Sequence, residues 1–336
     1  MKKILSIART PITTYPHTAN IAAILWDNAR IYPWLLGRFI NLYGLNNEDM
    51  DYEDCWILDC PAIQYKRIDK REIRRSWKKI GTFIKKSIDE EYYIYLPVDT
   101  GMITAYGERQ HPHDMLIFGY DDERKIFHIA DFFQGKRYGF STASYTEVEN
   151  ALQQSLNYWI FNDDIILMKV NQDAVFSFEP SSVCESIREY LDASKTKTDL
   201  YSRVKYFPSL FNKGVPEKFI YGMDCYKIIY NYLLNNDNFE LQHNIQVFHL
   251  FSEHKEVMYE RINYMGENRY LKNYDYYCKK YKNIFDKARL CQTYYIKFII
   301  TEKPEILKRI YKIVKVIESE ERSVLEEMVN DIIVIQ

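Results

Sequence analysis

The hydrophobic period of this chain changes from that of strands to that of helices near residue 181, and this change indicates the class of fold. Four short runs rich in β-branched and aromatic residues occupy positions 92–98, 115–120, 126–130 and 165–170, a composition typical of β-strands. From residue 181 onward the apolar residues recur every three to four positions instead, as they do in amphipathic helices. A block of strands followed by a block of helices indicates an α+β chain rather than one of alternating βα units.

Helices are expected on both sides of this block of strands. In the first half they are predicted over residues 18–29, 33–43, 69–90 and 146–155, and in the second half over residues 183–193, 223–234, 239–265, 270–300 and 304–335. A chain of 336 residues is long for one domain. We therefore predict an α+β domain over residues 1–175 and a mostly α-helical domain over residues 181–336.

Composition and charge exclude several classes of protein. The net charge of −2 argues against a general nucleic-acid binder, which usually carries a basic excess. No apolar run is long enough to span a membrane, and Arg9, Pro11 and Pro16 interrupt any signal-peptide core. The six cysteines form no CxxC pair, which favours free thiols in a reducing cytoplasm and no structural zinc. We expect a cytoplasmic protein that uses no metal and no diffusible cofactor.

The densest chemical signal lies between His111 and Asp131. Two strand-like runs there are joined by the turn-forming residues of GYDDERKIF, which predicts a β-hairpin. With the turn near residues 122–124, His113 at the start of one strand comes opposite about Asp131 at the end of the next. A carboxylate that holds one nitrogen of an imidazole leaves the other nitrogen free to act as a base. A surface hairpin with scattered polar residues is the alternative interpretation.

The run HDMLIFGYDDERKIFHIADFF resembles the His–Asp hairpin of papain-like cysteine peptidase folds, particularly the bacteriocin-processing C39-type peptidases. The chain resembles more closely the butirosin biosynthesis protein H N-terminal family, and the segments PWLLGRFINLYG and FHLFSEHKEVMYERI share in that resemblance. Its strongest part covers roughly residues 90–135.

This resemblance implies a papain-like N-terminal domain and an acyltransferase of thiotemplated (nonribosomal) antibiotic biosynthesis. Such an enzyme passes an acyl group from the phosphopantetheine thioester of a carrier protein to an amine. Carried over to this sequence, the family's motif makes His113 the general base and Asp131 the carboxylate that orients it.

The nucleophile of papain-like enzymes is missing from its expected place. Those folds hold a cysteine at the N-terminus of the first core helix, but the segment TYPHTANIAAIL contains none. Its polar candidates are Thr13, Thr14, Tyr15, His17, Thr18 and Asn20. Cys55 and Cys60 remain as alternative nucleophiles, although the neighbouring Asp54 and Asp59 would raise their thiol pKa. A thioester is already activated, so the missing thiol counts more strongly against a peptidase than against an acyltransferase.

A carrier protein is acidic, and its docking site is expected to be basic. Arg71, Arg74, Lys78 and Lys79 lie on the predicted helix 69–90 and are candidates for that site, whereas a solvated helix face would explain the same charges. Two other functions remain open. One is a catalytically degenerate papain-like protein that binds or scaffolds partners, and the other is a cysteine-peptidase-like hydrolase.

Overall fold

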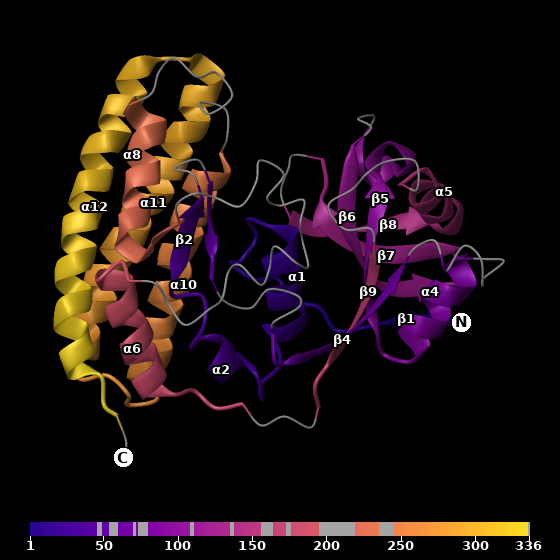
Figure 1. Ribbon diagram of the computed structural model, residues 1–336, viewed down its shortest axis with the longest axis horizontal. Coiled ribbons are helices and arrows are strands. Elements are labelled where there is room, and N and C mark those ends of the chain that lie inside the picture. The colour runs from indigo at the N-terminus through magenta and orange to yellow at the C-terminus, as the bar shows by residue number, and fades with distance from the viewer. Residues whose placement is uncertain are drawn as a thin grey trace. The chain divides into compact units, whose positions relative to one another are not determined.

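The computed structural model (Figure 1) describes residues 1–45, 49–53, 60–69, 72, 80–107, 111–134, 138–155, 164–172, 176–194, 219–234 and 245–334. The chain forms two compact units. The first comprises Met1–Asn28, Trp56–Val175 and Leu200–Val215, and the second comprises Ala29–Cys55, Phe176–Asp199 and Pro216–Gln336. The predicted division near residue 176 coincides with a unit boundary. Residues 29–55, however, belong to the second unit, so the first unit is not the continuous segment 1–175 that we expected.

An antiparallel sheet is the centre of the first unit. Its strands run in the order β4 (Ile63–Asp69), β9 (Asp164–Val170), β5 (Tyr93–Asp99), β6 (Pro112–Asp121), β7 (Ile126–Phe132) and β8 (Tyr138–Ser144), and β1 (Lys2–Ile4) pairs with the far end of β6. The four predicted strands are present as β5, β6, β7 and β9. The sequence analysis missed β1, β4 and β8, which carry weaker apolar patterns.

Three helices of the first unit flank this sheet: α1 (Pro16–Leu25), α4 (Ile80–Asp89) and α5 (Tyr145–Ser155). Helix α1 starts two residues before the predicted 18–29 because Pro16 occupies its first turn. The predicted helix 69–90 is wrong at its start, since Asp69 pairs with Asp164 at the end of strand β4. Helices α4 and α5 contribute apolar side chains to one core with alternate residues of β5, β6 and β7.

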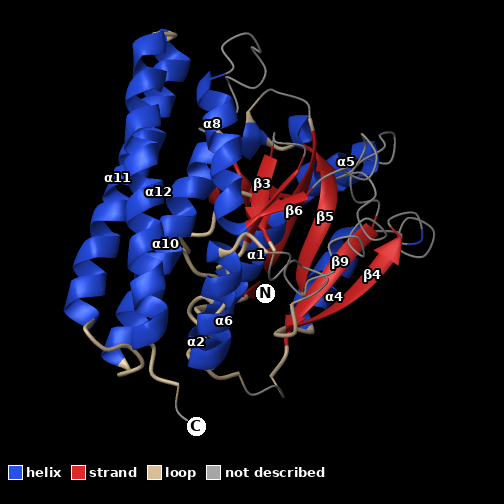
Figure 2. Ribbon diagram, turned by 60° about the vertical axis from the view of Figure 1, so that its left-hand side comes forward, coloured by secondary structure: helices blue, strands red, loops and turns tan. Residues whose placement is uncertain are grey.

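The second unit combines a small sheet with long helices. Its strands are β10 (Phe219–Tyr221), β2 (Leu42–Leu45) and β3 (Asp49–Tyr52). Its helices are α2 (Tyr32–Leu35), α6 (Pro180–Leu191), α8 (Tyr226–Leu234), α10 (Gln246–Glu267), α11 (Tyr274–Thr301) and α12 (Pro304–Asp331). Figure 2 shows α10, α11 and α12 packed side by side. The predicted mostly α-helical second half is therefore confirmed.

The predicted helix 33–43 is wrong beyond Leu35. Phe39 takes a positive φ of 56°, and residues 42–45 form strand β2 instead. Buried side chains of α10 supply the reason, because Arg261 donates hydrogen bonds to the carbonyl oxygens of Leu36 and Arg38. These tertiary partners satisfy carbonyl groups that a longer helix would have satisfied along its own backbone.

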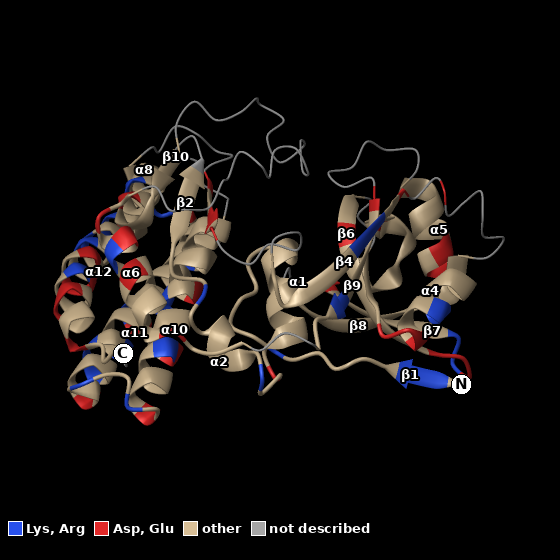
Figure 3. Ribbon diagram, turned by 60° about the horizontal axis from the view of Figure 1, so that its bottom comes forward, with Lys and Arg blue, Asp and Glu red and all other residues tan. Residues whose placement is uncertain are grey.

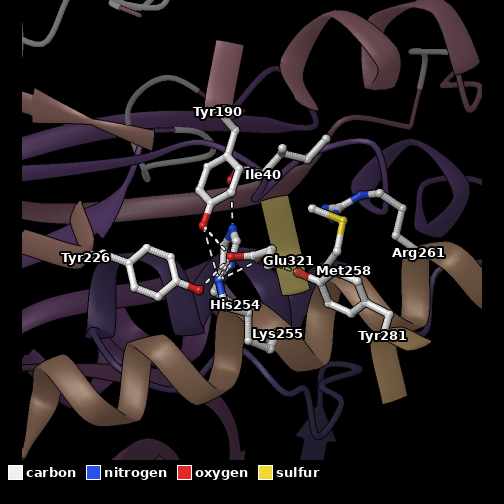
Figure 4. Close-up of polar contacts among 9 residues, drawn as sticks. All are labelled: Ile40, Tyr190, Tyr226, His254, Lys255, Met258, Arg261, Tyr281 and Glu321. Carbon is white, nitrogen blue, oxygen red and sulfur yellow. Dashed lines mark hydrogen bonds and ion pairs between the residues drawn. The ribbon is translucent and has the colours of Figure 1, made fainter. Parts of the chain in front are cut away.

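A buried ion pair joins the helices of the second unit (Figure 4). Lys255 of α10 and Glu321 of α12 are 1% and 0% exposed, and Lys255 Nζ lies 2.7 Å from Glu321 Oε1. Three tyrosine hydroxyls also donate to the Glu321 carboxylate, those of Tyr190, Tyr226 and Tyr281. Because the carboxylate has partners from four other helices, it fixes how those helices pack against one another.

His254 completes this network from the position next to Lys255. Its Nε2 lies 2.8 Å from the carbonyl oxygen of Ile40, and its Nδ1 lies 3.2 Å from Lys255 Nζ. Burial, together with the neighbouring lysine charge, lowers the pKa of His254 to about 3. The imidazole is therefore neutral, with Nε2 donating to Ile40 and Nδ1 accepting from Lys255.

Along the long helices α11 and α12, lysines and arginines are interspersed with aspartates and glutamates, so neither helix has a single sign of charge (Figure 3). None of the helices in the described part of the chain has the length and apolar character needed to cross a membrane.

Removing the Lys255 charge should destabilise the second unit strongly. We expect Lys255→Met to lower the free energy of unfolding by about 3–5 kcal/mol, because Glu321 would remain as a buried carboxylate without its cation. Lys287→Met is a matched control. Its ion pair with Glu320 likewise joins two long helices, α11 and α12, but the two side chains are 26% and 39% exposed. Loss of this exposed pair should change the free energy of unfolding by less than about 1 kcal/mol. Urea denaturation of both variants measures the difference, and equal effects would contradict a structural role for the network.

Candidate functional site

The β6–β7 hairpin sets the positions of the two predicted site residues. The Asp121 carboxylate accepts hydrogen bonds from the backbone N–H groups of Glu123 and Arg124, each at 3.1 Å, which fixes the turn. The last pair in the ladder is Leu116 with Ala130. His113 and Asp131 therefore lie on one face of the sheet, since alternate residues share a face. They are diagonal neighbours rather than directly opposite each other, and side chains of this length reach across a diagonal.

The structure brings His113 and Asp131 together. His113 Nδ1 lies 2.8 Å from Asp131 Oδ2 and 3.0 Å from the carbonyl oxygen of Asp114. Both partners are acceptors, so Nδ1 carries a proton and the neutral ring has its lone pair on Nε2. Asp131 is 1% exposed and His113 is 28% exposed. Nε2 is thus the nitrogen that a substrate can meet, and no hydrogen bond to it is found among the described residues.

Tyr106 is a third member of the site that the sequence analysis missed. It ends the short 3₁₀ helix Thr104–Tyr106, and its hydroxyl donates to Asp131 Oδ2, the same oxygen that binds His113. Burial and the Asp131 charge raise the pKa of Tyr106 well above its usual value, so the hydroxyl keeps its proton and remains a donor. Glu147 of α5 holds this short helix in place by accepting from the backbone N–H of Thr104 at 2.9 Å. No motif in the sequence connects residue 106 to residue 131.

The charge state of His113 follows from two opposing effects. Burial lowers its pKa, but the Asp131 carboxylate more than offsets this and raises the pKa from 6.5 to about 9. The ring is therefore an imidazolium at neutral pH. Because the folded pKa is the higher one, this ion pair stabilises the fold fully below pH 6.5, by about 3 kcal/mol, and the contribution is lost as the pH rises through about 9.

A second carboxylate, Asp114, follows His113 directly in β6. Its Oδ2 accepts a hydrogen bond of 3.1 Å from the hydroxyl of Tyr95. Burial raises the pKa of Asp114 to about 6, although the charges of His113 and, more weakly, His17 pull it downward. Asp114 Oδ1 and Asp131 Oδ1 are both buried and have no hydrogen-bond partner in the described structure.

The first turn of α1 lies close to these acids and contains no thiol. The His17 ring stacks on Tyr15 with 5.5 Å between ring centroids, and its charge acts on Asp114. The hydroxyl of Thr18 donates to the carbonyl oxygen of Tyr15 at 3.2 Å. Further along the helix, Asn20 Oδ1 accepts a hydrogen bond of 2.6 Å from the hydroxyl of Tyr138 in β8. Histidine, threonine and asparagine thus occupy the positions near the helix start where a papain-like enzyme would hold its cysteine.

Cys60 does not join the site. It is a buried free thiol just before β4. The registers of β4, β9 and β5 place Ile63 at the end of the sheet away from the row of Val98 and His113. At about 3.3 Å per residue the separation along the strands alone is roughly 20 Å. Cys55 lies outside the described residues, as do the predicted docking residues Arg71, Arg74, Lys78 and Lys79.

Across the described ranges, no group of three or more histidine, cysteine, aspartate or glutamate side chains is arranged to hold a metal ion. No protein-family model matches this chain, and no curated protein shows significant sequence similarity to it.

The raised pKa of His113 can be measured directly. In a nuclear magnetic resonance titration we expect the His113 ring signal, assigned by its absence in His113→Gln, to titrate near pH 9. Asp131→Asn should move this pKa down by at least about one unit, because burial still disfavours the imidazolium while the offsetting carboxylate is gone. His128, which no carboxylate contacts directly and whose pKa burial lowers, serves as the internal control. A His113 pKa that is the same in both proteins would rule out the ion pair.

Proposed function

We propose that this protein is an acyltransferase that moves an acyl group from a carrier-protein thioester to an amine, in the biosynthesis of a thiotemplated metabolite. The observation that carries the proposal is the His113–Asp131 pair, with a buried carboxylate on Nδ1 and an accessible Nε2. This is the arrangement that a positioned general base requires. The resemblance of residues 90–135 to the butirosin biosynthesis protein H N-terminal family supplies the substrate class.

Three features of the fold support a papain-like assignment. A histidine lies at the start of one antiparallel strand, an aspartate lies at the end of the next, and the first turn of a buried helix lies close enough to Asp114, beside that histidine, for the His17 charge to act on it. Papain-like enzymes use these three positions for their base, its orienting group and their nucleophile. The helix position lacks a thiol here, so we propose direct transfer without a covalent acyl-enzyme.

The direct reaction balances with His113 as the only proton carrier. As the amine nitrogen attacks the thioester carbonyl, Nε2 of neutral His113 removes a proton from that nitrogen. The tetrahedral intermediate then collapses, the C–S bond breaks, and the leaving thiolate takes the proton back from Nε2. Asp131 stabilises the imidazolium that exists between these two steps. A general base of this kind contributes about 10²–10⁴-fold in rate.

The pKa of His113 predicts when the base is available. Only the neutral ring can accept a proton, and at pH 7 this form is about one per cent of the total, because the pKa is about 9. The rate of transfer should therefore increase about tenfold per pH unit until the pH reaches the pKa. The acyl acceptor can be hydroxylamine, which is already neutral at pH 7. The dependence of the rate on pH then reports the titration of His113 and not that of the acceptor.

A non-catalytic binding protein is the second candidate. Two observations favour it: α1 has no cysteine in its first turn, and His113 is charged at neutral pH. A fixed imidazolium next to aromatic rings could bind a partner without turning it over. In that case the His–Asp pair would serve recognition alone.

Transfer from an acyl-loaded carrier protein to hydroxylamine, followed by intact mass, tests the proposal. We expect His113→Gln to slow transfer by about 10²–10⁴-fold, and Asp131→Asn to slow it by a similar or smaller factor because the imidazole remains. His128→Gln on the same hairpin and Cys60→Ala should retain nearly full activity.

Two results would contradict direct transfer. A covalent acyl adduct on any residue of the chain would restore a nucleophilic mechanism. Equal rates for the parent, His113→Gln and Asp131→Asn would show that the pair has no catalytic role and would favour the binding protein.

A further inference from the structure

The cluster around His113 carries more negative than positive charge. Asp131 is a buried carboxylate and Asp114 a partly buried one, and the imidazolium of His113 is the one cation that contacts either of them among the described residues. Each acid also keeps one buried oxygen, Oδ1, without a hydrogen-bond donor in this part of the chain. An unsatisfied buried acceptor of this kind costs about 1–3 kcal/mol, and more when it is charged. The protein thus maintains two acceptors that its own described groups do not satisfy.

Neutral aromatic groups surround these acids and leave the charge imbalance in place. The hydroxyls of Tyr95 and Tyr106 donate to Asp114 and Asp131, but burial raises the pKa of both tyrosines, so they bring donors and no charge. Tyr95 is within electrostatic range of both carboxylates. Asp114, Asp131, Tyr95, Tyr106 and His113 therefore form one electrostatic cluster, although Asp114 and His113 are neighbours on a strand.

Aromatic faces lie at the edge of this cluster. The Phe132 ring is 6.3 Å from the His113 ring, and the Phe133 ring is 5.0 Å from the Tyr106 ring. Aromatic rings attract cations over their faces, and carboxylates attract them more strongly. A ligand that matches the cluster must bring positive charge and several N–H donors in a small volume. A primary ammonium group has both, with three donors on one nitrogen.

We propose that Asp114 recognises a protonated primary amine, with its Oδ1 atom as the acceptor and the nearby negative charge of Asp131 adding to the attraction. Binding of the amine does not depend on the proposed function; only the identification of this amine as the acyl acceptor rests on it. The acceptor then enters as an ammonium ion and gives one proton to bulk water before it attacks, and His113 carries only the second proton, the one removed during attack. Asp114 is the specificity-determining residue, because Asp131 is already committed to His113 and Tyr106.

Binding of n-butylammonium to the full-length chain tests recognition without any turnover. Calorimetric titration should show that n-butylammonium binds and that 1-butanol, which has the same chain but no charge, does not. We expect Asp114→Asn to weaken the binding of n-butylammonium by at least about tenfold, the effect of losing a charge-assisted hydrogen bond. Asp122→Asn is the matched control. Its carboxylate, at the turn of the same hairpin, pairs with Lys85, and the change should leave binding unaltered.

A measurement on the unmutated protein tests the proposal even if the Asp114→Asn variant does not fold. Affinity for n-butylammonium should fall as the pH drops below about 6, where Asp114 gains a proton. Equal binding of n-butylammonium and 1-butanol, or full affinity in a folded Asp114→Asn, would overturn the proposal. So would the absence of n-butylammonium binding to the parent, because ordered water would then satisfy the two oxygens.

The two proposals fail in distinguishable ways. Asp114-dependent binding of n-butylammonium without any acyl transfer would support recognition and refute the acyltransferase. Acyl transfer with an unchanged KM for the amine in Asp114→Asn would support the acyltransferase and refute this recognition role.

Discussion

The candidate site of the first unit depends on one buried carboxylate, Asp131, which two side chains stabilise. Asp131 is 1% exposed, and a buried charge is tolerated only when it is paired and hydrogen-bonded. His113 supplies the charge and Tyr106 supplies a neutral donor, both to the same oxygen. That arrangement raises the pKa of His113, occupies Nδ1 so that Nε2 is the nitrogen left for a substrate, and leaves the other carboxylate oxygen without a partner among the described residues. The chemistry open to the site follows from those three consequences.

In the second unit a buried carboxylate, Glu321, has a structural role instead. Glu321 is as deeply buried as Asp131, yet both of its oxygens have partners from other helices. Its cation, Lys255, is hydrogen-bonded as well, and His254 is held neutral between Lys255 and a backbone carbonyl. Complete satisfaction of this kind stabilises one packing of the helices and leaves no group for a ligand. Incomplete satisfaction of Asp114 and Asp131 is the feature on which the proposed ammonium site is based.

The spacing of apolar residues along the chain predicted most of the helices and four of the strands. The strands β5, β6, β7 and β9 and the helices after residue 181 have strong periodic signals, and the structure has them close to the expected positions. Helix 33–43 was predicted by the same rules and is wrong, because Arg261 binds the carbonyls of Leu36 and Arg38 from more than two hundred residues away. Strand β4 was missed because its sequence, IQYKRID, has a weak apolar pattern, and only its pairing with β9 shows it to be a strand.

The sequence by itself determined that two strands around residues 115–120 and 126–130 form a hairpin, because a two-residue period and turn residues are short-range signals. It did not determine the face of His113 relative to Asp131, because the register of the ladder shifts by one residue between Ile117 and Gly119, and this bulge puts both side chains on one face. Only the tertiary structure decided that Tyr106 shares the Asp131 oxygen, that Cys60 lies at the far end of the sheet, and that Asp114 keeps an unpaired oxygen. Those facts depend on burial and on which distant segments pack together, and neither quantity is encoded in the spacing of residues along the chain.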